Sequence, residues 1–282
     1  MTIAIAHLGP TGTNAETAAL AYASWLTKKK GQETLLSPYP SIAQTLRSVV
    51  HKKVDLAVVP VENSTEGSVA ITLDTLWELD RLQIQQELVL PISHALLSHS
   101  KSLSQIKTVY SHPQALAQCQ KWLEGFLPSV QLIPTNSTTE AVQQISQDPQ
   151  AGAIAAPRAS KLYDVPILAA DINDYPDNCT RFWVMGLTPS TSGNRTSIAF
   201  SVPANVPGAL VKPLQVFAQR GINLSRIESR PTKRSLGEYL FFLDLEASAT
   251  ETSTQEALAE LSPYTEVLKI FGSYDVLPIS TL

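Results

Sequence analysis

The stretch Cys179-Thr180-Arg181-Phe182-Trp183-Val184-Met185-Gly186 joins a polar start to an apolar run. An apolar run of this length is typical of a buried β-strand. The polar start places Thr180 and Arg181 at the rim of a sheet, where side chains can meet a ligand. This strand comes late in the chain, after two sets of alternating strands and helices, and its position therefore indicates two lobes.

Upstream of this strand, short apolar runs alternate with helical segments. Strands are predicted at 2–8 and 54–60, and helices at 14–30, 41–52 and 68–79. Alternation of this kind favours a parallel sheet with helices on both faces. We therefore expect the first lobe to be an α/β unit.

An extended segment at 82–98 then leads into a second lobe with the same alternation. Strands are expected there at 108–111, 130–133, 151–155 and 165–169, and helices at 113–126, 137–147 and 157–163. The chain then crosses back to the first lobe with the strand at 181–187. Two α/β lobes joined by two crossings leave a cleft between them, a geometry similar to type II periplasmic-binding proteins.

A polar linker at 189–194 separates this two-lobed part from the rest of the chain. We expect a first domain over 1–188, with one lobe over about 1–81 and 171–188 and the other over about 82–170. The second domain covers 195–282. Its expected strands lie at 196–202, 222–229, 237–246 and 267–271, and its helices at 208–220 and 253–261. The order βαββαβ is that of a ferredoxin-like unit.

Charge and composition exclude several classes of function. The chain of 282 residues has a formal net charge of −4 and no basic stripe, which argues against a nucleic-acid partner. The N-terminus lacks the pattern of a signal peptide, and no apolar run is long enough for a membrane span. Cys119 and Cys179 lack metal-ligand or C-x-x-C spacing, so we expect reduced thiols, a cytoplasmic location and no metal.

Four polar clusters follow strand-like runs, at 9–13, 60–64, 111–114 and 180–181. Clusters at strand ends can converge on one cleft. Two of them also open predicted helices, whose N-terminal amides attract anions. Together they predict a site for a small anion rich in oxygen.

The chain resembles prephenate dehydratases followed by an ACT regulatory domain. The strings that carry the resemblance to the dehydratases are LGPTGTNAETAA from Leu8, VPVENSTEGSV from Val59, VYSHPQALAQC from Val109 and NCTRFWVMG from Asn178. Those that resemble an ACT domain are PGALVKPLQVFAQRGINLSRIESRP from Pro207 and GEYLFFLDLE from Gly237. They span nearly the whole chain. Asn14-Ala15 departs from the first motif, where the family usually has an aromatic residue and then serine.

The resemblance implies that the protein converts prephenate to phenylpyruvate, carbon dioxide and water without a cofactor. It identifies Thr180 as the catalytic threonine, which hydrogen-bonds the departing hydroxyl, and ties Asn63 to the activity. The substrate-binding residues that we expect are Ser111, Gln118, Arg181, Glu62, Thr11, Gly12 and Thr13. For Arg181 and Glu62 a structural ion-pair network is the alternative, and for Thr11, Gly12 and Thr13 it is simple turn formation.

The ACT resemblance implies regulation by phenylalanine, bound where two segments meet across a dimer interface. The residues expected to form this site are Gly208, Ala209, Leu210, Asn223, Leu224, Glu228, Ser229 and Arg230. The protein would then be a homodimer or homotetramer through its ACT domains. Two alternatives remain: an arogenate dehydratase, which performs the same reaction on an amino analogue, and a non-catalytic amino-acid-binding sensor.

Overall fold

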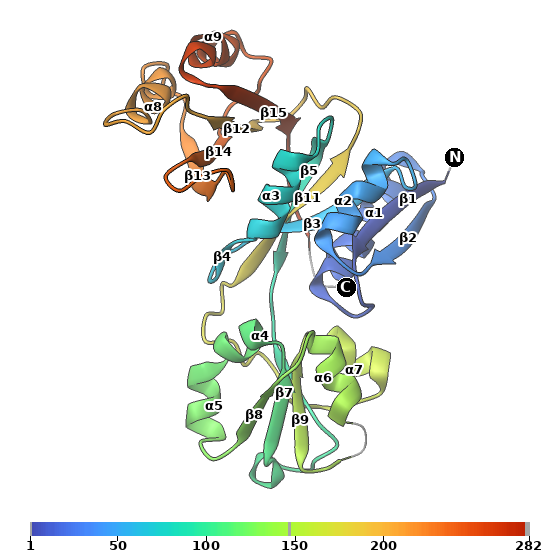
Figure 1. Cartoon of the computed structure of the whole chain (residues 1–282). Coiled ribbons are helices and arrows are strands. Elements are labelled where there is room, and N and C mark those ends of the chain that lie inside the picture. Colours follow the sequence, from blue (N-terminus) through green and yellow to red (C-terminus); the bar gives the residue numbers. More distant parts are fainter. Residues whose placement is uncertain (1, 146–147, 280–282) are drawn as a thin grey trace.

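Three β-sheets organise the structure, a computed structural model that describes residues 2–145 and 148–279. The sheets follow one another along the molecule, with the first lobe in the middle, the second lobe at one end and the C-terminal domain at the other (Figure 1). The last two residues of the helix expected at 137–147 lie outside the described residues. The α/β class and the order of the domains are as the sequence predicted.

The first lobe is built on a sheet with the strand order β16-β5-β11-β3-β1-β2. Its strands are β1 (Ile3–Leu8), β2 (Thr34–Tyr39), β3 (Leu56–Asn63), β4 (Gly67–Ser68, paired with β3), β5 (Gln83–Pro91), β11 (Cys179–Gly186) and β16 (Val276–Pro278). Its helices are α1 (Asn14–Lys30), α2 (Ile42–Val50) and α3 (Ala70–Glu78).

Both faces of this sheet are covered, and β11 shows how. Successive side chains of a strand point to opposite faces. Phe182 and Val184 accordingly pack into the apolar cluster around α1. Trp183 and Met185 pack into the other cluster, which contains α2, α3 and side chains of the C-terminal domain. The run of apolar residues in this strand follows from burial on both faces.

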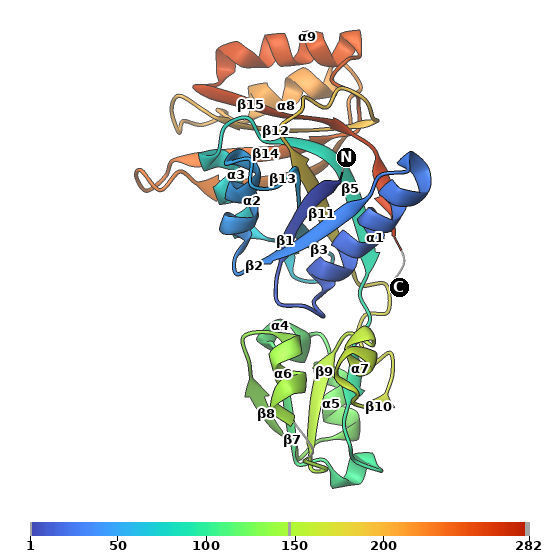
Figure 2. The same ribbon diagram turned by 90° about the vertical axis from the view of Figure 1, so that its right-hand side faces the viewer.

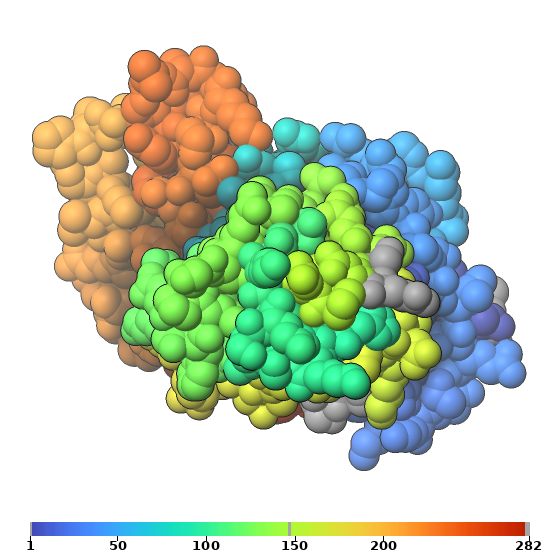
Figure 3. Space-filling model, turned by 90° about the horizontal axis from the view of Figure 1, so that it is seen from below, coloured from blue at the N-terminus to red at the C-terminus, as the bar shows by residue number. Residues whose placement is uncertain are grey.

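The second lobe has a smaller sheet with the strand order β10-β6-β9-β7-β8. Its strands are β6 (Ala95–Leu97), β7 (Thr108–Ser111), β8 (Gln131–Pro134), β9 (Ala151–Ala155) and β10 (Ile167–Ala169). Its helices are η1 (Leu103–Gln105), α4 (Pro113–Ala117), α5 (Gln120–Phe126), α6 (Thr138–Ile145) and α7 (Arg158–Tyr163). Seen from below, this lobe lies in front of the blue first lobe and the orange C-terminal domain (Figure 3).

The C-terminal domain has the predicted order βαββαβ. It consists of β12 (Arg195–Ser201), α8 (Val211–Ala218), β13 (Leu224–Pro231), β14 (Tyr239–Leu245), α9 (Thr252–Leu261), η2 (Ser262–Tyr264) and β15 (Val267–Tyr274). The strands form a sheet ordered β13-β14-β12-β15. Figure 2 shows α8 and α9 on the outer face of this sheet, while its inner face lies against the first lobe.

Three features of the connections differ from expectation. The first lobe was expected to end near residue 81, yet β5 pairs with β11 along its whole length, so the first crossing lies after Pro91. The strand β16 leaves the C-terminal domain and pairs with β5 in the first lobe. The segment expected as a linker is bound along β15, because the Ser273 amide donates to the carbonyl of Ser190.

Helix length and the state of the two cysteines bear on the environment in which the protein works. Within residues 2–145 and 148–279, no helix combines the length and the apolar character needed to cross a membrane. Cys119 and Cys179 are free thiols. Burial raises the pKa of the Cys119 thiol to about 12, so this thiol stays protonated near neutral pH.

The bound linker predicts an unequal effect of two glycine substitutions. Gly193 has φ = 128°, and a Cβ there would lie 2.1 Å from the carbonyl carbon of Tyr274. Gly31, at the end of α1, has φ = 62° with open space around it. Gly31→Ala should therefore cost about 1–2 kcal/mol from backbone strain alone, and Gly193→Ala considerably more. Equal melting temperatures for the two variants would contradict this packing of the linker.

Candidate active site

A cavity of about 480 Å³ lies between the two lobes. The first lobe contributes Thr13, Asn63, Thr180 and Phe182 to its lining, among others, and the second lobe contributes residues that include Gln118. Of the four polar clusters seen in the sequence, each supplies at least one lining residue. The structure therefore brings the clusters together as predicted.

Thr180 and Asn63 lie directly opposite each other on β11 and β3. The Asn63 side-chain oxygen accepts hydrogen bonds from the backbone amides of Thr65 and Glu66, at 3.0 and 3.1 Å. Because backbone amides can only donate, the Asn63 nitrogen must face the other way, where it donates to the Thr180 hydroxyl oxygen at 3.0 Å. The Thr180 hydroxyl accepts this bond, so its own proton is available for the cavity.

The same reasoning orients the neighbouring amides. Asn63 also donates to the side-chain oxygen of Asn178 at 2.8 Å, and the Asn178 nitrogen donates to the oxygen of Gln118 at 3.0 Å. Gln118 belongs to the second lobe, and its nitrogen donates back to Asn63 and to Thr65. The expected site residue Gln118 is thus fully bonded, and it joins the two lobes at the base of the cavity.

His94 completes this network, although the sequence did not single it out. Its Nε2 lies 2.8 Å from the Gln118 oxygen, which already acts as an acceptor, so Nε2 carries the proton. Burial lowers the pKa of His94, and the hydrogen bond with Gln118 raises it by less. The ring is therefore neutral near pH 7. Its Nδ1 is buried without a partner among the described residues.

Three expected anion-binding residues at the first helix have other partners. The Gly12 amide donates to the carboxylate of Glu16 at 2.7 Å, and the Thr13 hydroxyl caps α1 by accepting from the Glu16 amide. Thr11 is exposed, and its carbonyl accepts from Tyr163 of the second lobe. Gly12 and Thr11 therefore do not fit the expected role, whereas Thr13 still lines the cavity.

Ser111 also differs from expectation. Its side chain is fully buried, and its hydroxyl donates to the carbonyl of Ile154 at 2.7 Å. The residue does not appear in the cavity lining, although His112 and Gln114 of the same cluster do. Ser111 holds the end of β7 against β9, and its hydroxyl proton is used in that bond.

Arg181 and Glu62 were expected to bind substrate, and the structure contradicts this. Each is the strand neighbour of a cavity residue, so its side chain points to the opposite face of the sheet. Arg181 binds Glu62 at 2.6 Å, Glu87 at 2.6 Å and Asp244 of the C-terminal domain at 2.8 Å. Burial lowers the pKa of Arg181, but Asp244 and Glu87 outweigh it and hold the pKa well above its usual range. The structure therefore shows the alternative, in which Arg181 and Glu62 belong to a structural ion-pair network.

The described lining of the cavity is polar and apolar but carries no acidic or strongly basic side chain. Among its described lining residues there is no Lys, Arg, Asp or Glu. The first turns of α1 and α6 line it with Asn14, Ala15, Ser137 and Thr138. The first amides of a helix lack intrahelical acceptors and carry partial positive charge, which favours an anion beside these turns. The carboxylates of Glu16 and Glu140 already accept from the Gly12 and Asn136 amides at the two helix starts, and this offsets part of that charge. The described residues hold no His, Cys, Asp or Glu cluster that could bind a metal.

In the C-terminal domain, two of the expected effector residues of β13 face the first lobe, whereas Leu224 packs against the core of its own domain. Glu228 accepts a hydrogen bond from Ser68 at 2.9 Å, and Arg230 binds Asp74 of α3 through two nitrogens. Gly208 is exposed and has φ = 82° in the turn before α8. The expected site spans two chains, so one chain shows only its separate halves.

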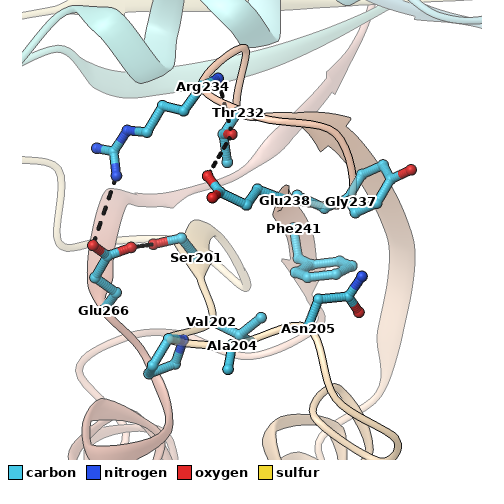
Figure 4. A pocket seen from close by; sticks show the side chains of 12 residues that line it. Ser201, Val202, Ala204, Asn205, Thr232, Arg234, Gly237, Glu238, Phe241 and Glu266 are labelled. Atoms are coloured by element: carbon cyan, nitrogen blue, oxygen red, sulfur yellow. Dashed lines mark hydrogen bonds and ion pairs between the residues drawn. The ribbon is translucent and has the colours of Figure 1, made fainter.

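A second cavity of about 270 Å³ lies at the end of the C-terminal sheet (Figure 4). Its charged side chains have partners within the lining: Arg234 pairs with Glu266, and Glu238 accepts a hydrogen bond from the Thr232 hydroxyl. None of the residues expected to bind phenylalanine appears among those that line it. This cavity is therefore separate from the expected effector site.

Known proteins share both parts of the chain. A profile of the prephenate dehydratase family matches residues 5–190, and one of the ACT domain matches residues 196–262. The bifunctional chorismate mutase/prephenate dehydratase of Aquifex aeolicus is 44% identical over 96% of this chain and 73% of its own length. The prephenate dehydratase of Lactococcus lactis subsp. cremoris is 37% identical over 96% of this chain and 97% of its own. A crystal structure of prephenate dehydratase from Arthrobacter aurescens in complex with L-Phe has 35% identity and a TM-score of 0.85, over 97% of this chain and 90% of that one.

Fold and site define a two-lobed α/β enzyme with an appended regulatory domain. The chain belongs to the prephenate dehydratase family and carries a C-terminal ACT domain. As a member it is a carbon–oxygen lyase that converts prephenate to phenylpyruvate, carbon dioxide and water, as the sequence predicted. Membership also favours an enzyme over the alternative of a non-catalytic sensor.

The interlobe contact at Glu16 predicts a pH effect on stability. Glu16 of α1 binds Arg158 of α7 at 2.6 Å. Burial raises the pKa of Glu16, but Arg158 and the Gly12 amide outweigh it, and the pKa lies below its ordinary 4.5. This contribution is present above pH 4.5 and is lost as the pH falls through the lower folded pKa.

Glu16→Gln should therefore lower the melting temperature at pH 7, and its difference from the wild type should shrink below about pH 4.5. The exposed Glu124, replaced by Gln, serves as the control and should show little difference at either pH. A Glu16→Gln deficit that stays constant down to pH 3 would show that the carboxylate charge is not what joins the lobes there.

Proposed function

We propose that Thr180 donates a hydrogen bond to the departing ring hydroxyl of prephenate and that Asn63 holds it in place. The observation that carries this role is the direction of the Asn63–Thr180 bond, which leaves the threonine proton available. A threonine hydroxyl is too weakly acidic to be a general acid near neutral pH, so it acts as an oriented donor. A water molecule would supply the proton that the leaving hydroxide takes up.

The substrate is held by neutral groups. Prephenate carries two carboxylates, and the first turns of α1 and α6 face the cavity where the pyruvyl carboxylate, which is retained, would lie. The rest of the lining is largely apolar, with Leu8, Val69 and Phe182 among its residues. An apolar wall without a cation solvates the leaving carboxylate poorly, and this favours its loss as carbon dioxide.

The reaction balances without a cofactor. The dianion loses one charge with the hydroxide that leaves and keeps one on the pyruvyl carboxylate, while carbon dioxide departs neutral. The ring becomes aromatic as both groups leave. The catalyst therefore needs only to bind the dianion, assist the hydroxide and exclude water, and the described side chains suffice for these tasks.

For the C-terminal domain we propose phenylalanine as effector and a dimer or tetramer as the working form. Both the ACT match and the L-Phe complex of the Arthrobacter aurescens protein support this. Glu228 would bind the ammonium group, and Gly208 and Ala209 of the other chain would face the ligand.

The domain division proposed here follows the sheets, with the second lobe over about 92–178. The two free thiols suit a cytoplasmic location.

Two substitutions of Thr180 test the catalytic role. Thr180→Ala should lower kcat for phenylpyruvate formation by about 10²–10³, because it removes one preorganised donor. Thr180→Ser keeps the hydroxyl and should retain most of the activity. The measurement is the ultraviolet absorbance of phenylpyruvate formed from prephenate, with and without phenylalanine. An alanine variant as fast as the serine variant would reject Thr180 as the donor.

The cavity also predicts a preference between the two related substrates. Arogenate carries an ammonium group where prephenate has a ketone. None of the described lining residues is a carboxylate that could pair with this group. The kcat/KM for prephenate should therefore exceed that for arogenate by about tenfold or more. Equal values measured side by side would show that the ammonium group finds a partner elsewhere.

A further inference from the structure

Two arginines meet the same two carboxylate oxygens between the first lobe and the C-terminal domain. Arg181 on β11 donates to Oε2 of Glu62 at 2.6 Å and to Oδ2 of Asp244 at 2.8 Å. Arg226 on β13 faces these same atoms at 3.7 and 3.9 Å. One guanidinium therefore holds both oxygens, and the other lies just outside hydrogen-bond distance.

Arg226 is buried but incompletely bonded. Its side chain is 5% exposed. Its Nε and Nη1 have no hydrogen-bond partner within the part of the chain that the structure describes. A buried donor without an acceptor is unfavourable. A shift of about 1 Å would bring both nitrogens to the shared oxygens, so a second arrangement lies close to the one observed.

A single hydroxyl connects Arg226 to the proposed effector residue. Nη2 of Arg226 donates to the Ser68 oxygen at 2.7 Å, and the Ser68 hydroxyl donates to Oε2 of Glu228 at 2.9 Å. Arg226 and Glu228 are two residues apart on β13, so both face the first lobe. A change of partner at Glu228 therefore reaches Arg226 through Ser68.

We propose that Arg226 and Arg181 exchange the oxygens of Glu62 and Asp244, and that this exchange carries the phenylalanine signal to Thr180. The inference rests on the proposed function, in which Glu228 binds the effector's ammonium group. In the observed state Arg181 holds both oxygens. When Glu228 turns to phenylalanine, Ser68 loses its acceptor, and Arg226 is released to take the oxygens from Arg181.

The exchange acts on catalysis through the strand. Arg181 is a positioning residue, because it anchors β11 at the position next to Thr180. Its partner across the strands is Glu62, which is the neighbour of Asn63 on β3. Arg181 also binds Glu87, at 2.6 Å in the structure. It keeps this bond after the exchange, so its charge stays paired. The strand end that carries Thr180 loses two of its three anchors. A displaced donor affects the transition state more than ground-state binding, so kcat should fall with little change in KM.

The test uses the full chain with Arg226→Gln and Ser68→Ala. Prephenate turnover is measured over a range of phenylalanine concentrations, and phenylalanine binding is measured by calorimetry. Arg226→Gln should bind phenylalanine and keep basal kcat, but lose the phenylalanine-dependent fall in kcat. Ser68→Ala removes the link that holds Arg226 away from the shared oxygens, so its kcat should already be low without phenylalanine and should fall no further when phenylalanine binds. Arg226→Lys keeps one charge that cannot span both oxygens, so it should restore only part of the response. Ser68→Ala removes one hydroxyl and decides the outcome if Arg226→Gln does not fold.

The matched control is Lys269→Gln. Lys269 also joins the C-terminal domain to the first lobe, through the carbonyl of Trp77 and the side chain of Asp80, but it does not touch the shared oxygens. This variant should keep the wild-type response. If Arg226→Gln and Ser68→Ala bind phenylalanine and are inhibited like the wild type, the exchange is wrong.

Hydrogen exchange of residues 179–186 gives a readout that does not need turnover. Phenylalanine should speed amide exchange in this strand of the wild type and leave it unchanged in Arg226→Gln. A wild type that turns over prephenate without responding to phenylalanine rejects the effector and the exchange together. A wild type whose strand responds to phenylalanine but which does not turn over prephenate contradicts the proposed function and leaves the exchange supported.

Discussion

The largely buried guanidinium of Arg181, with 16% of its side chain exposed, fixes how the C-terminal domain sits on the catalytic sheet. A charge out of water must be paired, and removing one partner of such a pair typically costs about 3–5 kcal/mol. Two of its carboxylates, Glu62 and Glu87, come from the first lobe, and the third, Asp244, comes from the C-terminal domain. The apolar surface around them tolerates small sliding movements, but the charges meet only in a narrow range of orientations.

The two faces of one pair of strands divide the work of the protein. On one face Thr180 and Asn63 meet the cavity, and on the other their neighbours Arg181 and Glu62 meet the regulatory domain. This division keeps cations away from the leaving carboxylate, because the strongest charges lie behind the sheet. In the proposed exchange it also makes regulation short-ranged, because a single peptide bond separates Thr180 from Arg181.

Much of this arrangement could be predicted from the sequence. The alternation of strands and helices gave the lobes, and the spacing of the motifs gave the family and the cavity. Strand alternation could also have excluded Arg181: if Thr180 faces the cleft, its neighbour cannot. Likewise Thr13 and Glu16 have the spacing of a capping box, in which the glutamate carboxylate turns back to the amides that precede the helix.

Other features could not be predicted because they depend on tertiary contacts. His94 is buried because the two segments that connect the lobes lie side by side there. In the sequence, its own segment shows only an extended apolar run. The pairing of β16 with β5 joins residues nearly two hundred positions apart, and a strand of three residues has no periodicity to recognise. The contacts of Glu228 and Arg230 with the first lobe depend on how two folded units dock.

The return of β16 to the first lobe has a consequence for the architecture as a whole. The C-terminal domain enters from β11 and leaves through β16, and both strands flank β5 in one sheet. It is thus held like an inserted module, tethered at two points, and cannot swing as a pendant unit would. Grafting a foreign sensor onto this enzyme would require reproducing both tethers, because a fusion at the linker alone would leave an uncovered sheet edge.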